Sequence, residues 1–238
     1  MRPTYRLVRS QASADEFHRR SVPDPAPREL WLLDVDRPAL VLGSSQPDDL
    51  VDREACERAG VEVVRRRSGG GAVLLIPGEV VWLDVIVPRG APGWSDDVHG
   101  PMRWFGGHLA AVVGERLPGS AVEVHHGAMV STAWSSTVCF DGIGAGEVAL
   151  DGSKLVGISQ RRMRHAARLQ CCWYSGYEPE RLVALLAPRH RPPVDALSPV
   201  ATLPVEDARA IPAAVVQRLA ASPGGPTGSS GRPMGENG

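Results

Sequence analysis

The sequence predicts an α+β fold with a central, mostly antiparallel or mixed β-sheet flanked by helices. Short β-branched runs recur along the chain, and only a few segments space their apolar residues as a helix does. The predicted strands and helices do not alternate regularly, which argues against a parallel α/β sheet. A chain of 238 residues can form one large domain or two small ones, and its core needs no disulfide.

The first half of the chain supplies most of the predicted central strands. A strand over 5–9 precedes a short helix, for which Ser13 and Glu16 have the spacing of a capping box. A helix over 51–59 ends at Gly60, a residue that favours helix termination. The remaining predicted strands of this half are 29–34, 38–43, 61–66, 72–76 and 80–87.

The second half opens with the longest helical pattern, over 97–117, which Pro118 and Gly119 terminate. Asp151 and Gly152 form a good hairpin turn. Short strands are expected on both sides of that turn, at 121–125, 136–140, 146–150, 154–159 and 167–174. A helix follows over 179–187, one or two short helices lie within 205–221, and the Ser-, Gly- and Pro-rich residues 222–238 are expected to be disordered.

The composition excludes several classes of function. Hydrophobic residues make up 43% of the chain, charged residues 22%, and the net charge is −1. This charge gives no overall attraction to nucleic acid or to an anionic membrane. No apolar run reaches transmembrane length and residues 1–5 do not open a signal peptide, so we expect a cytoplasmic protein. The four cysteines fit no zinc spacing, and each is expected to be a small buried hydrophobe, with Cys139 as the exception discussed below.

The most informative stretch is Arg65-Arg66-Arg67-Ser68-Gly69-Gly70-Gly71-Ala72-Val73. Glycines let a backbone bend freely and let another group approach it closely. Arginines beside them supply permanent charge with planar donors. A glycine turn whose N–H groups face a ligand therefore suits a phosphate or carboxylate. The alternative is a basic turn that only joins two strands.

A second stretch, Gly152-Ser153-Lys154-Leu155-Val156-Gly157-Ile158-Ser159-Gln160, follows some eighty residues later. Together, RRRSGGGAV and GSKLVGISQ resemble the lipoate–protein ligase A branch of the biotin/lipoate ligase catalytic domain. The upstream run Val41-Leu42-Gly43-Ser44-Ser45-Gln46 is also similar to a strand end of that family. The resemblance covers roughly residues 5 to 187 and implies the class II aminoacyl-tRNA-synthetase-like fold of biotinyl and lipoyl ligases. We expect a catalytic domain of this type over 1–190, followed by a C-terminal helical extension over 191–221 that the resemblance does not cover.

The resemblance implies, as first hypothesis, an ATP-dependent ligase that needs Mg²⁺ and holds no permanent cofactor. Such an enzyme activates lipoate or octanoate as acyl-AMP and transfers it to a lysine of a lipoyl carrier domain. The carrier would belong to a 2-oxoacid dehydrogenase acyltransferase subunit or be the glycine cleavage H protein. Neither a nucleic acid nor a membrane is expected as partner, and no metal-binding residues are assigned.

The same resemblance assigns the site residues. Lys154, the lysine of GSKLVG, corresponds to the catalytic lysine that would contact the acyl carbonyl and the phosphate, although a lysine on a strand can also point to solvent. The acyl chain needs an apolar slot, which strands 72–76 and 80–87 could line. The nucleotide- and substrate-binding positions are Arg66, Ser68, Gly69, Gly70, Gly71, Ala72, Val73 and Leu74.

Two alternatives stay open. The Cys139-Phe140 pair before Lys154 is also similar to the single-domain octanoyltransferases, which take octanoate from acyl carrier protein through a cysteine thioester without ATP. Cys139 would then be a catalytic nucleophile rather than a core thiol. The third hypothesis is a non-catalytic ligand-binding member, because Leu74-Leu75-Ile76 replaces the aromatic, His and Asp residues that usually follow the turn in ligases. The neighbouring His125 and His126 receive no role, since adjacent strand residues face opposite sides.

Overall fold

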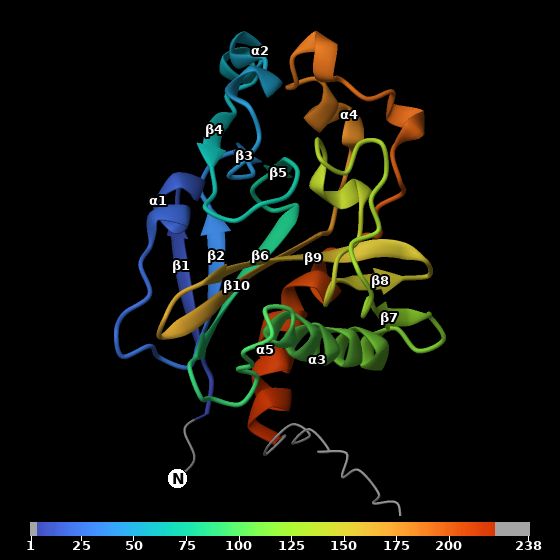
Figure 1. The fold of residues 1–238 in the computed structure, drawn as a ribbon. Helices are drawn as coiled ribbons and strands as arrows, with labels where there is room; N and C mark the ends of the chain where they lie inside the picture. Colours follow the sequence, from blue (N-terminus) through green and yellow to red (C-terminus); the bar gives the residue numbers. More distant parts are fainter. Residues whose placement is uncertain (1–3, 222–238) are drawn as a thin grey trace, which may run out of the picture.

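The computed structural model describes residues 4–221, so the tail predicted at 222–238 lies outside the described residues. Two β-sheets organise this part of the chain (Figure 1). The larger sheet has seven strands in the order β1-β2-β6-β10-β9-β8-β7, and the smaller has three in the order β4-β3-β5. Both sheets mix parallel and antiparallel pairs, as predicted, with β1–β2 and β3–β4 parallel.

The strands agree with the sequence predictions apart from one. The bounds of the large sheet are β1 Arg6–Ala12, β2 Glu29–Val35, β6 Val80–Pro88, β7 Val122–Val124, β8 Val148–Leu150, β9 Ser153–Arg162 and β10 Ala166–Tyr174. Those of the small sheet are β3 Ala39–Leu42, β4 Glu62–Arg65 and β5 Val73–Leu75. The hairpin turn between β8 and β9 is confirmed, since Asp151 has φ 50° and Gly152 has φ 82°.

The strand predicted over 136–140 is wrong. In its place, a single bridge joins Val138 to Ala72, and a short 3₁₀ turn, η2, spans Cys139–Asp141. The Lys154 ammonium accounts for the bend, because it binds the carbonyls of both Cys139 and Gly142. An extended strand would point successive carbonyls in opposite directions and could not offer both to one cation.

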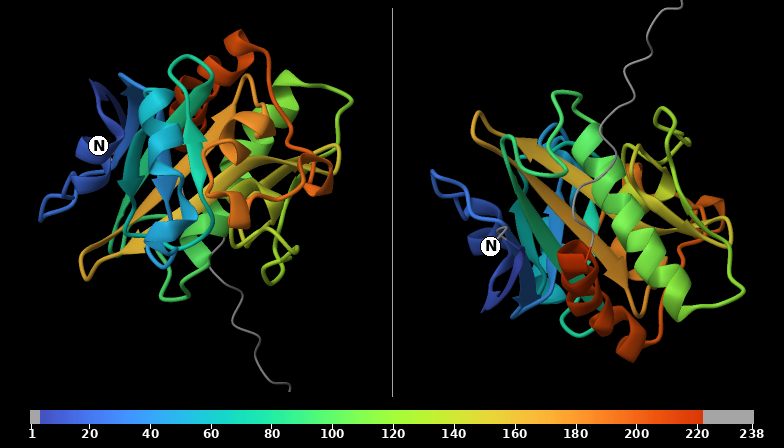
Figure 2. Two further views of the ribbon diagram at one scale, coloured as in Figure 1. Left: turned by 90° about the horizontal axis from the view of Figure 1, so that it is seen from above. Right: turned by 90° about the horizontal axis from the view of Figure 1, so that it is seen from below.

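Helices α3 (Gly100–Arg116) and α5 (Val205–Ala221) cover one face of the large sheet, as Figure 2 shows from below. Their buried side chains join the largest apolar cluster, with Phe105 and Leu109 from α3 and Ile211 and Val215 from α5. The small sheet and α1 (Ala14–Arg19) cover the opposite face. The predicted capping box of α1 is present at Ser13 and Glu16. The site described below lies where the small sheet meets the large one.

The remaining helices are short. They are α2 Arg53–Arg58 and α4 Pro179–Val183, with 3₁₀ turns at η1 Asp48–Leu50, η3 Pro188–His190 and η4 Val194–Ala196. Buried leucines of α4 and its C-terminal end, Leu182 and Leu185, share a third apolar cluster with Leu40 and Leu42 of β3. No helix in the described part of the chain combines the length and apolar character needed to cross a membrane.

Residues 205–221, predicted as one or two short helices, form one continuous helix despite Pro212 inside it. A proline has no N–H to donate to the carbonyl four residues earlier, which here is that of Ala208. The indole Nε1 of Trp173, on β10, donates to the Ala208 oxygen at 3.1 Å instead. The hydrogen bond that the helix lacks is thus supplied by the sheet.

Candidate active site

A cavity of about 530 Å³ lies between the two sheets and the start of α3, and we call it the site cavity. It borders β9, which pairs with β8 only through Ser153 to Val156. Beyond this paired part, Ile158 and Ser159 of β9 line the cavity. Lys154 of the same strand also lines the cavity. Residues from five other segments complete the lining: Arg66, Gly69, Gly70, Gly71, His99, Met102, Arg103, His126, Gly127, Ala128, Met129, Ser135, Cys139, Gly144, Ala145 and Glu147. Two stretches that the sequence singled out, the glycine turn and the lysine strand, therefore meet in one place.

The glycine turn crosses from β4 to β5, and its three glycines have different surroundings. Gly70 has φ 101°, a conformation that disfavours other residues. A Cβ on Gly71 would lie 2.6 Å from the backbone nitrogen of Cys139. A Cβ on Gly69 would meet nothing within 4 Å. The close approach that the sequence predicted is thus made at Gly71 by the chain itself, and Gly69 alone has open space beside it.

Arg66 holds the glycine turn from inside. Its side chain is buried, and Nη2 donates to the carbonyls of Gly69 at 2.9 Å and Gly71 at 3.0 Å. The same nitrogen lies 3.8 Å from Sγ of Cys139. Its Nε is buried without a hydrogen-bond partner among the described residues. A buried, unsatisfied donor costs roughly 1–3 kcal/mol, so a ligand oxygen that reached this nitrogen would gain a hydrogen bond.

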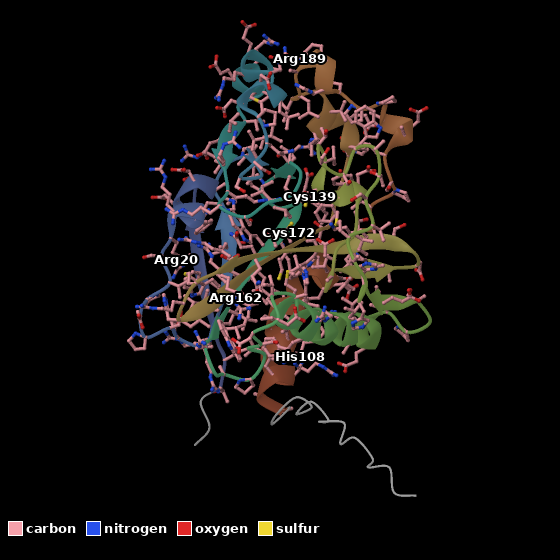
Figure 3. The ribbon with its side chains drawn as sticks, viewed as in Figure 1. Arg20, His108, Cys139, Arg162, Cys172 and Arg189 are labelled. Carbon is pink, nitrogen blue, oxygen red and sulfur yellow. The ribbon has the colours of Figure 1, made fainter. Side chains whose placement is uncertain are left out.

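Cys139 is held in place through its backbone. Its N–H donates to the Ala72 carbonyl at 3.0 Å, and the N–H of Ala72 donates to Thr137 at 2.8 Å. The amide of Gln46, from the motif that follows β3, donates to the carbonyls of Ser136 and Thr137. The three motifs noted in the sequence therefore converge on the segment that carries this cysteine. In Figure 3, Cys139 lies near the middle of the molecule, between the teal strands and the yellow-green segments.

Lys154 is buried, so it does not project to solvent from its strand. Its ammonium donates to the carbonyls of Cys139 at 3.0 Å and Gly142 at 2.9 Å and pairs with Oε2 of Glu147 at 2.7 Å. It also lies 5.0 Å from the ring centroid of Phe140. The three donors of the ammonium thus meet three oxygen acceptors, which fixes both the lysine and the segment 139–142.

Glu147 is a site residue that our sequence reasoning missed. Its carboxylate also accepts from the N–H groups of Gly144 at 2.7 Å and Ile158 at 2.9 Å. The sequence could have indicated this residue. The hairpin turn at Asp151 and Gly152 brings Glu147, which directly precedes β8, next to the strand that carries Lys154. The other cavity residues missed, such as His99, Arg103 and Met129, lie in loops and at a helix start that only tertiary structure brings together.

A second, small cavity of about 30 Å³ lies next to the first and shares Arg66 and Ser159 with it. Its other lining residues are largely apolar: His18, Val41, Val73, Leu75, Trp82, Gln170, Cys171 and Cys172. Burial, followed by the charges of Arg168 and Arg66, lowers the pKa of His18 to about 3, so this imidazole is neutral near pH 7. Val73, Leu75 and Trp82 belong to the strands from which the sequence predicted an apolar slot.

Polar contacts link the small cavity to the glycine turn. The Ser68 hydroxyl lies 3.0 Å from that of Ser159 and donates to Gln170 at 3.4 Å. The Gln170 amide in turn lies 3.3 Å from Nδ1 of His18. This chain of contacts fixes the orientation of Ser68, which is itself buried.

The predicted site residues thus divide into three groups. Arg66, the three glycines, Cys139 and Lys154 line the site cavity. Ser68, Ala72 and Val73 lie directly behind it, in the contacts just described. Leu74 lines neither cavity, since its side chain packs in the third apolar cluster and its carbonyl accepts from Tyr174 at 3.1 Å. Cys56 and Cys171 are buried, as expected for core thiols, whereas Cys139 and Cys172 are only partly buried.

Comparison with known proteins identifies a family. The model of the lipoyl protein ligase A/B catalytic domain matches residues 8–220. The chain is also 33% identical, over 165 residues, to the octanoyltransferase LipM of Kyrpidia tusciae. That match covers 67% of this chain and 59% of the relative, so the chain spans less than two thirds of that protein's length.

Solved structures show the same fold at low identity. A lipoate–protein ligase A bound with ATP superposes with a TM-score of 0.63 at 16% identity, covering 93% of this chain and 86% of that one. The bipartite lipoate–protein ligase of Thermoplasma acidophilum, solved in a study that includes its E2 lipoyl domain, gives 0.64 at 15%, covering 93% and 84%. The α+β ligase fold expected from the sequence motifs is confirmed.

Proposed function

Because the chain belongs to the lipoyl protein ligase A/B catalytic domain family, we propose that it transfers an octanoyl group to a lysine of a lipoyl carrier domain through Cys139. The sequence motifs placed ATP-dependent ligation first. We now place the thioester route before ligation because of the Cys139 sulfur, which lies on the site cavity 3.8 Å from the Arg66 guanidinium. The octanoyltransferase relative supports the same route.

In the proposed first step, the Cys139 sulfur attacks the thioester carbonyl of an octanoyl-acyl carrier protein after losing its proton. A new thioester forms on Cys139 and the carrier's thiol leaves, taking up a proton. The positive charge of Arg66 stabilises negative charge both on the attacking sulfur and on the developing oxyanion. The buried Nε of Arg66 has no partner among the described residues and would donate to this oxygen once the side chains that cover it move.

In the second step, the amine of the acceptor lysine attacks the Cys139 thioester. An amide bond forms, the carbon–sulfur bond breaks, and the sulfur recovers a proton from the amine, so no ATP is consumed. Lys154 positions the nucleophile in both steps, because it binds the Cys139 carbonyl and its charge is balanced by Glu147. We propose that the octanoyl tail points from the site cavity toward the small apolar cavity, which would widen to admit it.

ATP-dependent lipoate or octanoate ligation is the second candidate, favoured by the glycine turn. Gly69 is exposed with open space beside it, as a backbone that binds a nucleotide phosphate requires. The Arg66 Nε would then bind the carboxylate to be activated. Magnesium would enter with the triphosphate, whose phosphate oxygens are among its ligands.

Mass spectrometry of a lipoyl domain distinguishes the two candidates. One reaction contains octanoyl-acyl carrier protein without ATP, and the other contains lipoate or octanoate with Mg-ATP. We expect an octanoyl adduct in the first reaction, its loss in Cys139→Ala, and an acyl-enzyme of the wild type trapped before the acceptor is added. Modification only with ATP, unaffected by Cys139→Ala, would contradict the thioester route and establish ligation. Modification in neither reaction would leave a non-catalytic binding protein.

A further inference from the structure

Two arginines, Arg67 and Arg161, lie beside the site cavity. Arg67 directly precedes Ser68, and Arg161 follows Ser159 by two residues on β9. The two serine hydroxyls are 3.0 Å apart, which brings the two segments together. Alternate residues of a strand project from the same face, so Arg161 lies on the face of β9 that Ser159 presents to the glycine turn.

Within residues 4–221, these arginines have no negatively charged partner. Among the described residues, neither side chain makes a hydrogen bond or an ion pair, whereas the adjacent Arg162, labelled in Figure 3, donates to the carbonyl of Ser95 at 2.5 Å and lies 3.8 Å from Asp96. The pKa of Arg161 is lowered by its partial burial and then by the charges of Arg67 and Arg168. Two like charges held together without a counter-ion are a local site for an anionic group.

Apolar side chains are exposed on the other side of the cavity. Val98, Met129 and Val130 are 52–53% exposed, and they are three of the four large hydrophobic side chains most exposed in the described structure. They come from two loops that also line the cavity, through His99 and Met129. Gln160 of β9 donates to the Val98 carbonyl at 2.9 Å, which places the first loop beside β9. Exposed apolar groups next to uncompensated charge are typical of a protein-docking surface.

On the basis of the proposed transfer reaction, we propose that Arg67, Arg161, Val98, Met129 and Val130 form the docking surface for an acyl carrier protein. The arginines would pair with carboxylates on an acidic carrier surface, and the apolar groups would pack around the point where the acyl arm enters the cavity. The argument for this occupant is charge complementarity. The whole chain has a net charge of −1, so an acidic partner is attracted by this local pair rather than by the protein as a whole.

The test measures binding of octanoyl-acyl carrier protein to the Cys139→Ala protein, which prevents turnover. We expect the additional changes Arg67→Glu and Arg161→Glu to raise Kd at least tenfold and to weaken its salt dependence. The matched control is Arg209→Glu, which reverses an exposed arginine on α5 that also makes no side-chain ion pair or hydrogen bond among the described residues. An equal Kd for the double variant and the control would overturn the proposal.

Small substrates separate docking from chemistry. With octanoyl-pantetheine, the double variant of the enzyme with intact Cys139 should react at a rate within twofold of wild type. If octanoyl-phosphopantetheine loses rate as much as the full carrier does, the arginines bind the phosphate of the arm, and the docking proposal is wrong. The docking proposal is also wrong if the double variant binds the lipoyl domain more weakly but binds the acyl carrier protein as the wild type does. Carrier binding that depends on both arginines but yields no acyl transfer would refute the proposed function and support the docking surface.

Discussion

Two buried ion pairs in this protein have similar chemistry and different surroundings. Lys154 pairs with Glu147 and binds the carbonyls of the Cys139 segment, at the wall of a large cavity. Arg168 pairs with Asp84 at 2.5 Å inside the sheet, with 1% and 0% of these side chains exposed. Arg168 also donates to the carbonyls of Phe17 and Arg20 and so attaches the end of α1 to the sheet.

Burial and pairing alone therefore do not identify a functional charge. Both cations have their donors satisfied by a carboxylate and two carbonyls. Only Lys154 holds a segment that places a cysteine, the proposed nucleophile Cys139, on an open cavity. We therefore interpret the Lys154 pair as part of the reaction site and the Arg168 pair as part of the framework.

The largest expected effect is on activity. Lys154→Ala should lower the rate of octanoyl transfer by about a thousandfold, because the Cys139 segment loses the ammonium that fixes its carbonyls. It should also lower the free energy of unfolding, but by less than the loss of Arg168 does, since Glu147 lines the cavity and can be reached by water there. Single-turnover assays together with urea unfolding measure both quantities. A rate within tenfold of wild type would contradict the proposed role of Lys154 in positioning Cys139.

Arg168→Met should affect stability more than activity. It leaves the Asp84 carboxylate unpaired at a fully buried position, at a cost of about 3–5 kcal/mol in unfolding free energy. Replacing both partners, as Arg168→Met with Asp84→Leu, should recover much of this loss. Urea denaturation of the three proteins tests the prediction. If Arg168→Met lowers the free energy of unfolding no more than Lys154→Ala does, the assignment of the Arg168 pair to the framework is wrong.

The glycine turn offers a matched pair of substitutions. In Gly71→Ala, the new Cβ would collide with backbone atoms of Val138 and Cys139 at 2.6 Å. Backbone atoms cannot yield cheaply, so we expect the transfer rate to fall at least tenfold and the stability by about 1–3 kcal/mol. Gly69→Ala meets nothing within 4 Å and keeps its N–H, so its rate and stability should stay near wild type. Equal behaviour of the two variants would show that the Gly71 contact does not position Cys139.

The smallest expected effect is a pH dependence of the free energy of unfolding, which arises from the buried His18. His18 has its pKa lowered to about 3 in the folded protein, so the unfolded chain binds the proton first as the pH falls below about 6.5. Stability that is present at pH 7 is therefore lost on acidification, by about 2 kcal/mol at pH 5 from this group alone. Urea unfolding at both pH values should show a smaller loss in His18→Asn. An identical loss in both proteins would contradict this assignment.

The sequence predicts most of the fold because local patterns, such as caps, turns and apolar periodicity, indicate where most strands and helices begin and end. The capping box at Ser13, the turn at Asp151 and Gly152, and the long helical pattern that became α3 are all confirmed. The strand predicted over 136–140 failed because periodicity contains no information on the Lys154 contacts that bend this segment. The pairing of β4 and β5 with β3, rather than with each other, depends likewise on tertiary structure.

The candidate site was predicted in part. Motif resemblance led to Arg66, the glycines, Cys139 and Lys154, which the structure places on one cavity. Their roles in the reaction stay predictions until the variants are measured. Glu147 was missed although the hairpin register could have indicated it, and the cavity wall formed by α3 and the 126–129 loop depends on long-range packing. Nothing in the local sequence marks those residues.

The bond from Trp173 to Ala208 has a consequence for the order of folding. Before α5 reaches the sheet, the Ala208 carbonyl has no N–H from Pro212 to accept, so an isolated α5 is weakened at its middle. Docking on the sheet supplies the missing donor. We therefore expect the amides of α5 to become protected from hydrogen exchange together with those of β10, and not before them. The final helix of the described chain thus forms with the core on which it rests.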